Sequence, residues 1–533
     1  MQPYRLTIDK FLDHAAKWFG DREIVEADAG RIVARTTYAA LRERSNRLSG
    51  ALAFLWLARG DRLATLAWNG VHHLEVYYAT MGIGAVCHTL NPRMSLDHLA
   101  QIIGEADDRV LAVSASLVPL AQELLPRCPS LRHVIVLDLP QSTATLAHGD
   151  VTVWTIDELL AEHGAHVAWG GFDEETPAGL CYTSGTTGKP KGVLYTHRSN
   201  YLHTLRALQA DATALTAHDT VLLAVPMFHA NGWGFPFAAP AVGAKLVLPG
   251  RITDGPSLTR LMRDEGVTSA VGVYTVWMGV LDALDRDGGD LPALERVMLG
   301  GSTVPDAFVR RMEVRLGVEV QTSWGMTELS PIGTVAPRGA PRASGGSGRP
   351  TMGLDLKLTD ADGVTLPEQR GVVGRLWVKG ASVIDRYFDA TEDALDDDGW
   401  FETGDLAVID EAGNLTICGR SKDLIKSGGE WINPTEIEVV VGRHPAVACA
   451  AVIGRPDEKW GERPVLIVEP RLDHELDERE LLGALRGNVP DWWLPDEIAR
   501  VASMPLAATG KIDKQRLRAD YASGGIASRA VNR

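Results

Sequence analysis

One short stretch of the sequence combines residue types that bind anions. Residues 182–192 (YTSGTTGKPKG) contain four aliphatic hydroxyls, three glycines and two lysines, and they lie between two apolar, strand-like runs. Glycine lets backbone N–H groups approach a phosphate closely, hydroxyls donate hydrogen bonds, and lysines offset negative charge. The stretch is not a Walker loop, because Gly185 and Gly188 are too close together and Lys189 precedes a proline. It therefore predicts a loop that holds phosphate groups.

The elements that must position this loop follow from the pattern of apolar residues. Short apolar runs alternate with helical patterns over the first 140 residues, and a similar alternation returns over residues 220–299. A β-α-β-α order implies a parallel sheet with helices packed on it. The predicted strands are residues 61–67, 85–90, 110–114 and 133–137, and the predicted helices are residues 70–82, 95–106 and 117–125.

The character of the chain changes near residue 400. Turns rich in Gly, Asp and Asn bracket short strands there, as expected near a domain border. A compact segment of about 100 residues follows residue 420, with its own helix (433–443) and strands (448–453 and 464–468). Residues 523–533 are predicted to form a frayed tail.

Charge and composition exclude several classes of protein. Fifty-three Lys and Arg against 69 Asp and Glu give a net charge of −16, which repels nucleic-acid backbones, so we expect no nucleic-acid partner. The 45% hydrophobic and 23% charged content is typical of globular proteins. The five scattered cysteines show neither zinc spacing nor a disulfide framework.

One uncharged segment could be mistaken for a membrane span. Residues 221–244 contain no Lys, Arg, Asp or Glu, but they hold Pro226, Pro236 and Pro240, which would leave backbone groups unsatisfied in lipid. We interpret this segment as buried loop and strand. Because the chain starts without the apolar core of a signal peptide, we expect a cytoplasmic protein without a transmembrane segment.

Five motifs together resemble the adenylate-forming superfamily, which includes acyl-CoA synthetases, firefly luciferase and peptide-synthetase adenylation domains. They follow the order of that family and span residues 180–515. The motifs are the loop at 182–192, WGMTE at 324–328, WFETGD at 400–405, GRSKDLIK at 419–426 and ATGK at 508–511.

The resemblance implies an α/β fold in two domains. We expect a large N-terminal domain of doubly wound sheets plus a β-barrel-like part (residues 1–419), which holds the ATP and acyl sites. A hinge at residues 420–423 would connect it to a small, mobile α+β cap (424–522), followed by the tail (523–533). Lys422 stands at the hinge position, where one residue absorbs the dihedral change.

The resemblance also assigns the ATP site. Residues 183–191 would hold the leaving pyrophosphate, Glu328 and Thr183 would bind Mg²⁺, and Thr327 would contact the α-phosphate. Asp405 would accept hydrogen bonds from the ribose hydroxyls. Thr186, Glu328 and Lys511 are the expected catalytic residues, whereas Lys514 is expected to be solvated. The expected ATP- or AMP-binding residues are Thr183, Ser184, Gly185, Thr186, Thr187, Gly188, Lys189, Gly300, Gly301, Ser302, Trp324, Gly325, Met326, Thr327, Asp405, Arg420, Lys422, Lys426 and Trp431.

Some of these residues have a second interpretation. Asp405 and Arg420 could form a structural ion pair. Residues 427–430 (Ser427, Gly428, Gly429 and Glu430) resemble the loop that lines the pantetheine tunnel of CoA ligases, but they could also be a turn that enters the helix at Asn433-Pro434.

The acyl site is expected at an aromatic, glycine-rich segment. The pattern of His229 and Trp233 (His-x-x-x-Trp) resembles the corresponding segment of a subgroup of bacterial medium- and long-chain fatty acyl-CoA synthetases. In that subgroup the tryptophan gates the acyl tunnel, and its close relatives include methylmercaptopropionate–CoA ligases. Tyr274, Gly325 and Met326 could add to the wall. Residues 225–240 contain no Asp or Lys that would bind an amino group, so an α-amino acid is disfavoured.

The sequence therefore predicts an AMP-forming carboxylate–CoA ligase that uses ATP, Mg²⁺ and CoA. The preferred acid is a medium- or long-chain fatty acid, and methylmercaptopropionate or another short substituted acid is the alternative. An enzyme that stops at the adenylate or transfers to a carrier protein, and a non-catalytic nucleotide- or acyl-binding relative, are the rival functions. Relatives often form homodimers through the N-terminal region, so a homodimer is one expected state.

Overall fold

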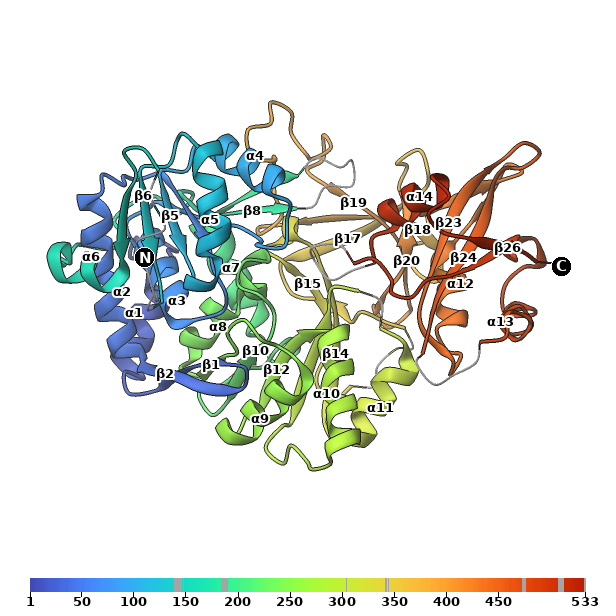
Figure 1. The fold of residues 1–533 in the computed structure, drawn as a ribbon, viewed down its shortest axis with the longest axis horizontal. Coiled ribbons are helices and arrows are strands. Elements are labelled where there is room, and N and C mark those ends of the chain that lie inside the picture. Colours follow the sequence, from blue (N-terminus) through green and yellow to red (C-terminus); the bar gives the residue numbers. More distant parts are fainter. Residues whose placement is uncertain are drawn as a thin grey trace.

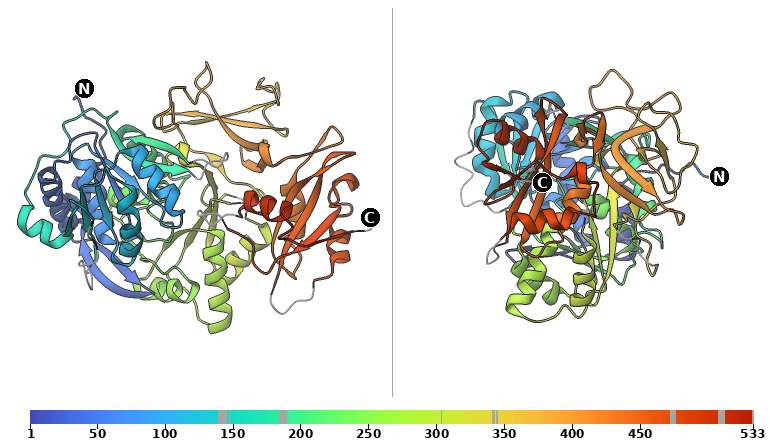
Figure 2. Two further views of the ribbon diagram at one scale, coloured as in Figure 1. Left: turned by 45° about the horizontal axis from the view of Figure 1, so that its top comes forward. Right: turned by 90° about the vertical axis from the view of Figure 1, so that its right-hand side faces the viewer.

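The computed structural model describes residues 1–138, 146, 148–183, 190–302, 304–340, 343, 345–471, 476–506 and 512–531. These residues form four sheets. Two large sheets, built from strands within residues 23–350, lie side by side, and the C-terminal sheet lies at the opposite end of the elongated molecule (Figures 1 and 2). Among the described residues, none of the helices is both long and apolar enough to cross a bilayer.

The seven-stranded sheet has the order β7-β6-β5-β3-β4-β8-β9 and is parallel except for β9. It confirms the strands and helices predicted over residues 61–137. Its strands are β3 (Arg62–Leu66), β4 (Val86–Thr89), β5 (Val110–Val113), β6 (His133–Val136), β7 (Thr152–Thr155), β8 (Pro177–Thr183) and β9 (Lys191–Thr196).

Successive residues of a strand point to opposite faces of the sheet, and in this sheet both sets of side chains are apolar. Leu63 and Val110 face a layer of α2 (Tyr38–Phe54), α3 (Val71–Gly82) and α6 (Ile156–His163). Their chain neighbours Ala64 and Leu111 face α4 (Leu96–Ala106) and α5 (Val118–Leu124). The sheet is therefore covered by helices on both sides, as predicted for a doubly wound sheet.

The nine-stranded sheet has the order β16-β15-β14-β13-β12-β10-β11-β1-β2, and its six central strands are parallel. Its strands are β1 (Glu23–Asp28), β2 (Arg31–Thr37), β10 (Thr220–Leu223), β11 (Lys245–Leu248), β12 (Ser269–Val273), β13 (Arg296–Gly300), β14 (Glu319–Gly325), β15 (Ile332–Val335) and β16 (Arg349–Pro350).

Helices cover both faces of this sheet too. One face packs on α9 (Gly255–Glu265), α10 (Tyr274–Asp287) and α11 (Asp306–Leu316). The other face packs on α1 (Asp9–Trp18) and α8 (Phe235–Val242), in an apolar cluster that also takes in α3 of the first sheet. This shared layer joins the two large sheets, and α7 (His197–Ala207) lies beside α8.

The interpretation of residues 221–244 as buried loop and strand needs a correction. Only the start of the segment is strand, in β10, and its end forms the helix α8. Pro236 is tolerated there because it occupies the first turn, where a missing N–H costs no helical hydrogen bond.

The third sheet is the β-rich part predicted before residue 420. It is antiparallel, in the order β17 (Leu354–Thr359), β18 (Val373–Gly380), β19 (Phe401–Ile409) and β20 (Leu415–Arg420). Its apolar face packs on Cys181, Tyr195 and Trp324 from the first two sheets. The third sheet therefore closes over the ends of β8 and β14.

The C-terminal part contains β21 (Ile425–Ser427), β22 (Glu430–Ile432), β23 (Val447–Asp457), β24 (Gly461–Pro470), β25 (Glu497–Arg500) and β26 (Ser528–Ala530), with α12 (Pro434–Val441), α13 (Glu478–Leu485) and α14 (Lys514–Ala522). Between β20 and β21 lies η5 (Ser421–Asp423), within the residues predicted to be a hinge, and their role as a hinge stays a prediction. The prediction of a frayed tail is wrong for β26, because residues 528–530 pair with β25. The other 3₁₀ turns are η1 (Ala115–Leu117), η2 (Leu125–Arg127), η3 (Ala230–Gly234), η4 (Thr327–Leu329) and η6 (Asp491–Trp493).

Candidate active site

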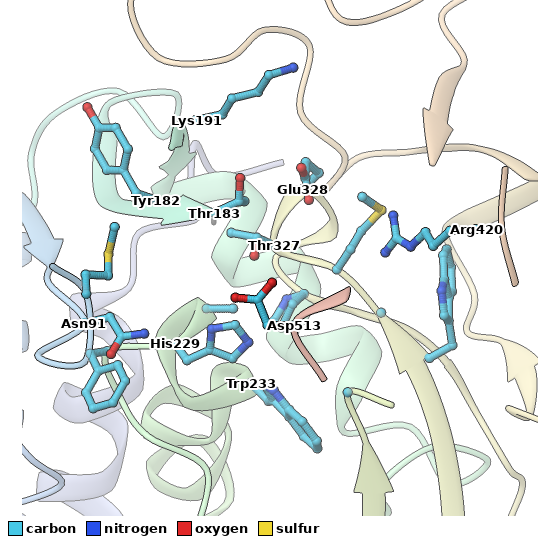
Figure 3. Close-up of a pocket in the computed structure, with 18 of the residues that line it drawn as sticks. Asn91, Tyr182, Thr183, Lys191, His229, Trp233, Thr327, Glu328, Arg420 and Asp513 are labelled. Carbon is cyan, nitrogen blue, oxygen red and sulfur yellow. The ribbon is translucent and has the colours of Figure 1, made fainter. Parts of the chain in front are cut away.

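A cavity of about 680 Å³ lies where the first three sheets meet the C-terminal part (Figure 3). Thr183 at the end of β8 and Trp324 near the end of β14 line it, as do residues 512–515 and 518 from the C-terminal part. Ligands bind at the carboxyl ends of parallel strands because the loops that follow those strands converge there. A second cavity of about 180 Å³ shares Gly301, Trp324 and Arg420 with the first.

The predicted ribose carboxylate lies in a preformed network. Asp405 on β19 and Arg420 on β20 are partners in the strand register, and Arg420 Nε lies 2.7 Å from Asp405 Oδ1. The indole Nε1–H of Trp324 donates to Asp405 Oδ2 at 2.9 Å. Asp405 is only 3% exposed. Asp405 and Arg420 both line the smaller cavity. The two residues therefore form the ion pair considered as an alternative above, and this pair also lies at the wall of a cavity.

The predicted metal carboxylate has different surroundings. Glu328 is 7% exposed and lines the larger cavity. Its Oε1 accepts a hydrogen bond from the Tyr387 hydroxyl at 2.9 Å, and among the described residues no cationic side chain lies within salt-bridge distance. Burial raises the pKa of the Glu328 carboxyl above its ordinary value, and the backbone N–H of Glu328, the Tyr387 hydroxyl and the more distant charges of Arg420 and Lys191 only partly oppose this shift. A buried carboxylate that no cationic side chain contacts directly fits a cation site.

The metal fit depends on the kind of site. Among the described residues, no group of three or more His, Cys, Asp and Glu side chains is placed to hold an ion. Mg²⁺ is commonly bound by one or two carboxylates together with substrate phosphates, and Glu328 with the nearby Thr183 matches that arrangement. Figure 3 shows Thr183, Thr327 and Glu328 close together beside the cavity.

The predicted acyl segment has an unusual backbone. Ala230, Asn231, Gly232, Trp233 and Gly234 all have positive φ, from 44° to 79°. Left-handed backbone costs roughly 1–2 kcal/mol per residue with a Cβ. Buried hydrogen bonds oppose this cost: the Asn231 side-chain oxygen accepts from the Cys181 thiol, and the Tyr77 hydroxyl donates to the Met227 carbonyl just before the turn at 2.6 Å.

This left-handed turn fixes where the indole of Trp233 lies. Trp233 is 6% exposed and lines the larger cavity with His229 and Phe228. A Cβ placed on Gly300 would lie 3.0 Å from Trp233 Cη2, so the indole packs directly on the glycine turn after β13. Figure 3 shows His229 and Trp233 on the side of the cavity opposite Lys191 and Glu328.

Comparisons with known proteins identify the family of this chain. The family model described as "AMP-binding enzyme" matches residues 12–388, and the model of the AMP-binding enzyme C-terminal domain matches residues 436–511. The chain belongs to the AMP-binding enzyme family. A medium-chain-fatty-acid–CoA ligase of Ectopseudomonas oleovorans is 40% identical over 531 residues, which are 98% of this chain and 97% of that relative.

Other relatives are similar over the same length. A 3-methylmercaptopropionyl-CoA ligase of Ruegeria lacuscaerulensis is also 40% identical and covers 98% of each chain. Among solved structures, ATP-bound MatB from Rhodopseudomonas palustris superimposes with a TM-score of 0.83 at 26% identity and covers 97% of this chain and 99% of that chain. The anthranilate CoA ligase AuaEII, solved with anthranoyl-AMP, shares the fold with a TM-score of 0.87 at 24% identity, covering 98% of this chain and 99% of the other.

Several predicted residues of this AMP-binding enzyme lie at the cavities. Gly301, Trp324, Gly325 and Arg420 line both, and Ser302 lines the smaller one. The larger cavity is also lined by Thr183, His229, Trp233, Met326, Thr327, Glu328 and Lys422. Burial lowers the pKa of the Lys422 ammonium below its ordinary value.

Other predicted residues are not brought to either cavity. Tyr274 packs edge-on against Phe308, with ring centroids 4.5 Å apart. Lys426 lies over the ring of Trp431, which is 51% exposed. The described parts of both cavities include none of these residues.

The predicted CoA loop is a tight β-hairpin. Gly428 and Gly429 connect β21 to β22 with φ of 62° and 92°, a conformation that favours glycine at both positions. Ser427 is buried and accepts a hydrogen bond from Arg463, and Glu430 begins β22. The hairpin therefore has a structural reason for its glycines, and its role toward CoA stays a prediction.

The expectation for Lys514 is wrong. Its ammonium lies 2.7 Å from Glu438 Oε1 on α12, and both side chains are only 17% exposed. This lysine is therefore held in an ion pair at the wall of the larger cavity instead of being solvated.

Some predicted residues lie outside the described part of the chain. They are Ser184, Gly185, Thr186, Thr187, Gly188, Lys189 and Lys511. The residues on either side are described: Thr183 and Lys191 are register partners on β8 and β9, and Ile512 and Asp513 line the larger cavity.

Sequence reasoning missed other lining residues. Tyr387 lies in the segment after β18, and Asn91 follows β4, and both contribute to the larger cavity. Arg518 on α14 also lines it and donates to Asp423 of η5 at 2.7 Å. None of these residues belongs to a recognisable motif, so only the fold could bring them to the site.

Proposed function

We propose that this enzyme is an AMP-forming carboxylate–CoA ligase. The acid reacts with ATP to give acyl-AMP and diphosphate, and CoA then displaces AMP to give acyl-CoA. The observation that carries the proposal is that one cavity joins the ends of the phosphate-type loop and the buried Glu328 to the apolar wall at Phe228 and Trp233. The full-length relatives named as CoA ligases support it.

Different residues of the chain are proposed to bind different parts of ATP. The proposal assigns the pyrophosphate to residues 183–191, and the α-phosphate to Thr327. It assigns the ribose to Asp405 with Arg420, and the adenine to the turn at residues 300–302 with Trp324. In-line attack on a phosphate depends mainly on such positioning and on charge stabilisation.

Glu328 and Thr183 would hold Mg²⁺ in this scheme. When bound, the ion would offset the charge of the phosphates. Lys511 would bring a further positive charge near the acid and the α-phosphate as they approach, and Thr186 would contact the leaving group. Lys422 would serve as the hinge between the adenylation and thiol-attack arrangements of residues 1–419 and 424–522.

We further propose that the acid is apolar, with a medium- or long-chain fatty acid preferred. Residues 225–240 carry no charged side chain, and Phe228 and Trp233 are apolar parts of the wall. The 40% identity to a 3-methylmercaptopropionyl-CoA ligase supports a second candidate, a short acid with a thioether. A panel from propionate and methylmercaptopropionate through octanoate to palmitate separates the two, because the preferred acid gives the highest kcat/KM.

Two measurements test the reaction itself. With ATP, Mg²⁺ and octanoate, we expect diphosphate release, and with CoA added we expect octanoyl-CoA and AMP in equal amounts. AMP without acyl-CoA would favour an enzyme that stops at the adenylate. No diphosphate with any acid in the panel would favour a non-catalytic binder.

A matched variant tests the role of Lys511. Lys511→Ala should abolish adenylation and leave thiol attack on supplied acyl-AMP nearly intact, because only the first step brings two anions together. Lys459→Ala is the control, since Lys459 is an exposed lysine of the same C-terminal part that lines neither cavity. Equal loss of both half-reactions in Lys511→Ala would contradict the assignment.

The setting of the enzyme completes the proposal. We place it in the cytoplasm, where ATP and CoA are available, with no nucleic-acid partner, because the net charge is −16. A homodimer is the proposed assembly, and sedimentation at micromolar concentration would test it.

A further inference from the structure

The segment that follows β18 is hydrogen-bonded to the backbone around Glu328. The backbone N–H of Ile384 donates to the Glu328 carbonyl at 3.0 Å. The Ser382 hydroxyl donates to the Leu329 carbonyl at 3.2 Å, and the Ser330 hydroxyl donates to the Ser382 carbonyl at 3.0 Å. Three hydrogen bonds therefore hold this segment against η4, which carries Glu328.

The same segment is also fastened to the start of β9. The Phe388 N–H donates to the Gly192 carbonyl at 2.8 Å. A Cβ on Gly192 would lie 2.8 Å from Phe388 Cβ, so glycine is needed at residue 192 for this close approach. The Lys191 ammonium lies 4.7 Å from the centre of the Tyr387 ring, which is a cation–π distance.

Tyr387 contacts both regions, because its hydroxyl bonds to Glu328 and its ring lies against Lys191. Its hydroxyl donates to Glu328 Oε1 at 2.9 Å, and it is the only side chain among the described residues that donates a hydrogen bond to this carboxylate. A neutral phenol orients a carboxylate without cancelling its charge, whereas a lysine or arginine in this place would compete with a metal ion. A carboxylate can accept about four hydrogen bonds or ligand contacts, so the bond from Tyr387 leaves acceptor capacity for a metal ion.

We propose that Tyr387 is a positioning residue that orients Glu328 for Mg²⁺ with ATP and couples this orientation to Lys191 at the base of the phosphate loop. This inference rests on the proposed function, in which Glu328 is the protein's carboxylate ligand. Partners that hydrogen-bond to metal ligands typically change metal affinity 10–100-fold, because they fix the direction of the ligand's lone pairs.

The test compares Tyr387→Phe with the wild type. The substitution removes the hydroxyl and keeps the ring over which Lys191 lies. In calorimetric titrations of Mg²⁺ into the full chain with α,β-methylene-ATP, which cannot release diphosphate, we expect Kd for Mg²⁺ to rise by about 10–100-fold. The Kd for the nucleotide in EDTA and the KM for the acid should stay within about twofold of the wild type.

Tyr38→Phe is the matched control. The Tyr38 hydroxyl is buried and donates to the Ala244 carbonyl at 2.6 Å, away from both cavities. This variant also loses one buried tyrosine hydrogen bond, but it should bind Mg²⁺ like the wild type. A similar loss of Mg²⁺ affinity in both variants would assign the effect to stability and overturn the proposal.

A double variant separates the inference from the function beneath it. If Tyr387 acts through Glu328, then Tyr387→Phe added to Glu328→Gln should change Mg²⁺ affinity by less than twofold, because the two effects are not additive. Wild-type Mg²⁺ affinity in Tyr387→Phe would overturn the positioning role alone. If the wild type itself shows no Mg²⁺-dependent nucleotide binding, the proposed function fails as well.

Discussion

Two buried carboxylates border the cavities of this enzyme, and their surroundings are opposite. Asp405 is 3% exposed and Glu328 is 7% exposed. Asp405 is paired with the guanidinium of Arg420 and accepts from the indole of Trp324. Glu328 accepts from one neutral phenol, that of Tyr387. Both acids are buried, but among the described residues only Asp405 is in direct contact with a cation, whereas Arg420 and Lys191 act on Glu328 from a greater distance.

This difference indicates which ligand group each acid suits. An ionised carboxylate that already has a cationic partner needs no further charge, and its remaining lone pairs suit neutral donors such as ribose hydroxyls. A buried carboxylate without a cation is costly, and its raised pKa expresses that cost. A bound metal ion would lower this cost of burying the charge. The contrast therefore supports the assignment of ribose to Asp405 and of Mg²⁺ to Glu328.

The largest expected effect comes from Glu328→Gln. The amide keeps an oxygen that can accept from Tyr387 but loses the charge, so we expect kcat/KM for ATP to fall about a thousandfold. Thermal stability should stay equal or rise, because a neutral amide costs less to bury than an unbalanced carboxylate. A clear fall in Tm would show that the charge of Glu328 is already balanced and would remove the contrast.

Asp405→Asn should behave in the opposite way. Losing the charged acceptor should raise KM for ATP about a hundredfold, through weaker bonds to the ribose. It also leaves Arg420 without its charged partner, so the free energy of unfolding should fall by about 1–2 kcal/mol, a range that allows for the partial exposure of Arg420. Urea denaturation measures this fall, and unchanged stability would mean that the ion pair contributes nothing to the fold.

Arg420→Lys tests whether the pair needs the planar fork of arginine. Lysine keeps the charge but cannot donate to Asp405 and to the Thr403 carbonyl with the same geometry. We expect KM for ATP to rise about tenfold with little change in kcat. If steady-state kinetics show wild-type values, a point charge is sufficient beside Asp405.

Trp324→Phe should give the smallest change. Phenylalanine keeps a flat face toward the proposed adenine site but removes the Nε1–H that donates to Asp405. One hydrogen bond to a carboxylate predicts about a fivefold rise in KM for ATP. A larger effect, with adenine-modified ATP analogues affected less than ATP, would assign the indole to adenine recognition and not to Asp405.

The fold and the candidate site could be predicted best where they depend on residues that are close together in the sequence. Apolar runs such as 62–66 and 110–113 predict strands buried on both faces, and the structure has them in β3 and β5. Residues 324–328 form one motif, and the structure brings Trp324, Gly325, Met326, Thr327 and Glu328 to one cavity. Local patterns of this kind need no knowledge of the fold.

Contacts between distant segments could not be predicted. Tyr387 lies 59 residues from Glu328 in a loop with no motif, so nothing in the sequence pairs them. Lys514 resembles a surface lysine until α14 is placed beside α12, which carries Glu438. Residues 528–530 (SRA) have no strand-like composition, and they form β26 because the edge of β25 offers them backbone partners.

The reversed handedness of residues 230–234 limits how the specificity of this enzyme could be redesigned. In a saturation library at Ala230, Asn231 and Trp233, many variants would be lost because they disfavour the left-handed backbone, whatever their effect on substrate binding. These positions have φ of 44°, 53° and 56°. Valine, isoleucine and threonine would be rejected there for conformational reasons, whereas glycine, asparagine and aspartate would be accepted. Changes of acid preference are therefore better sought at Phe228 and His229, which border the same cavity from outside that turn.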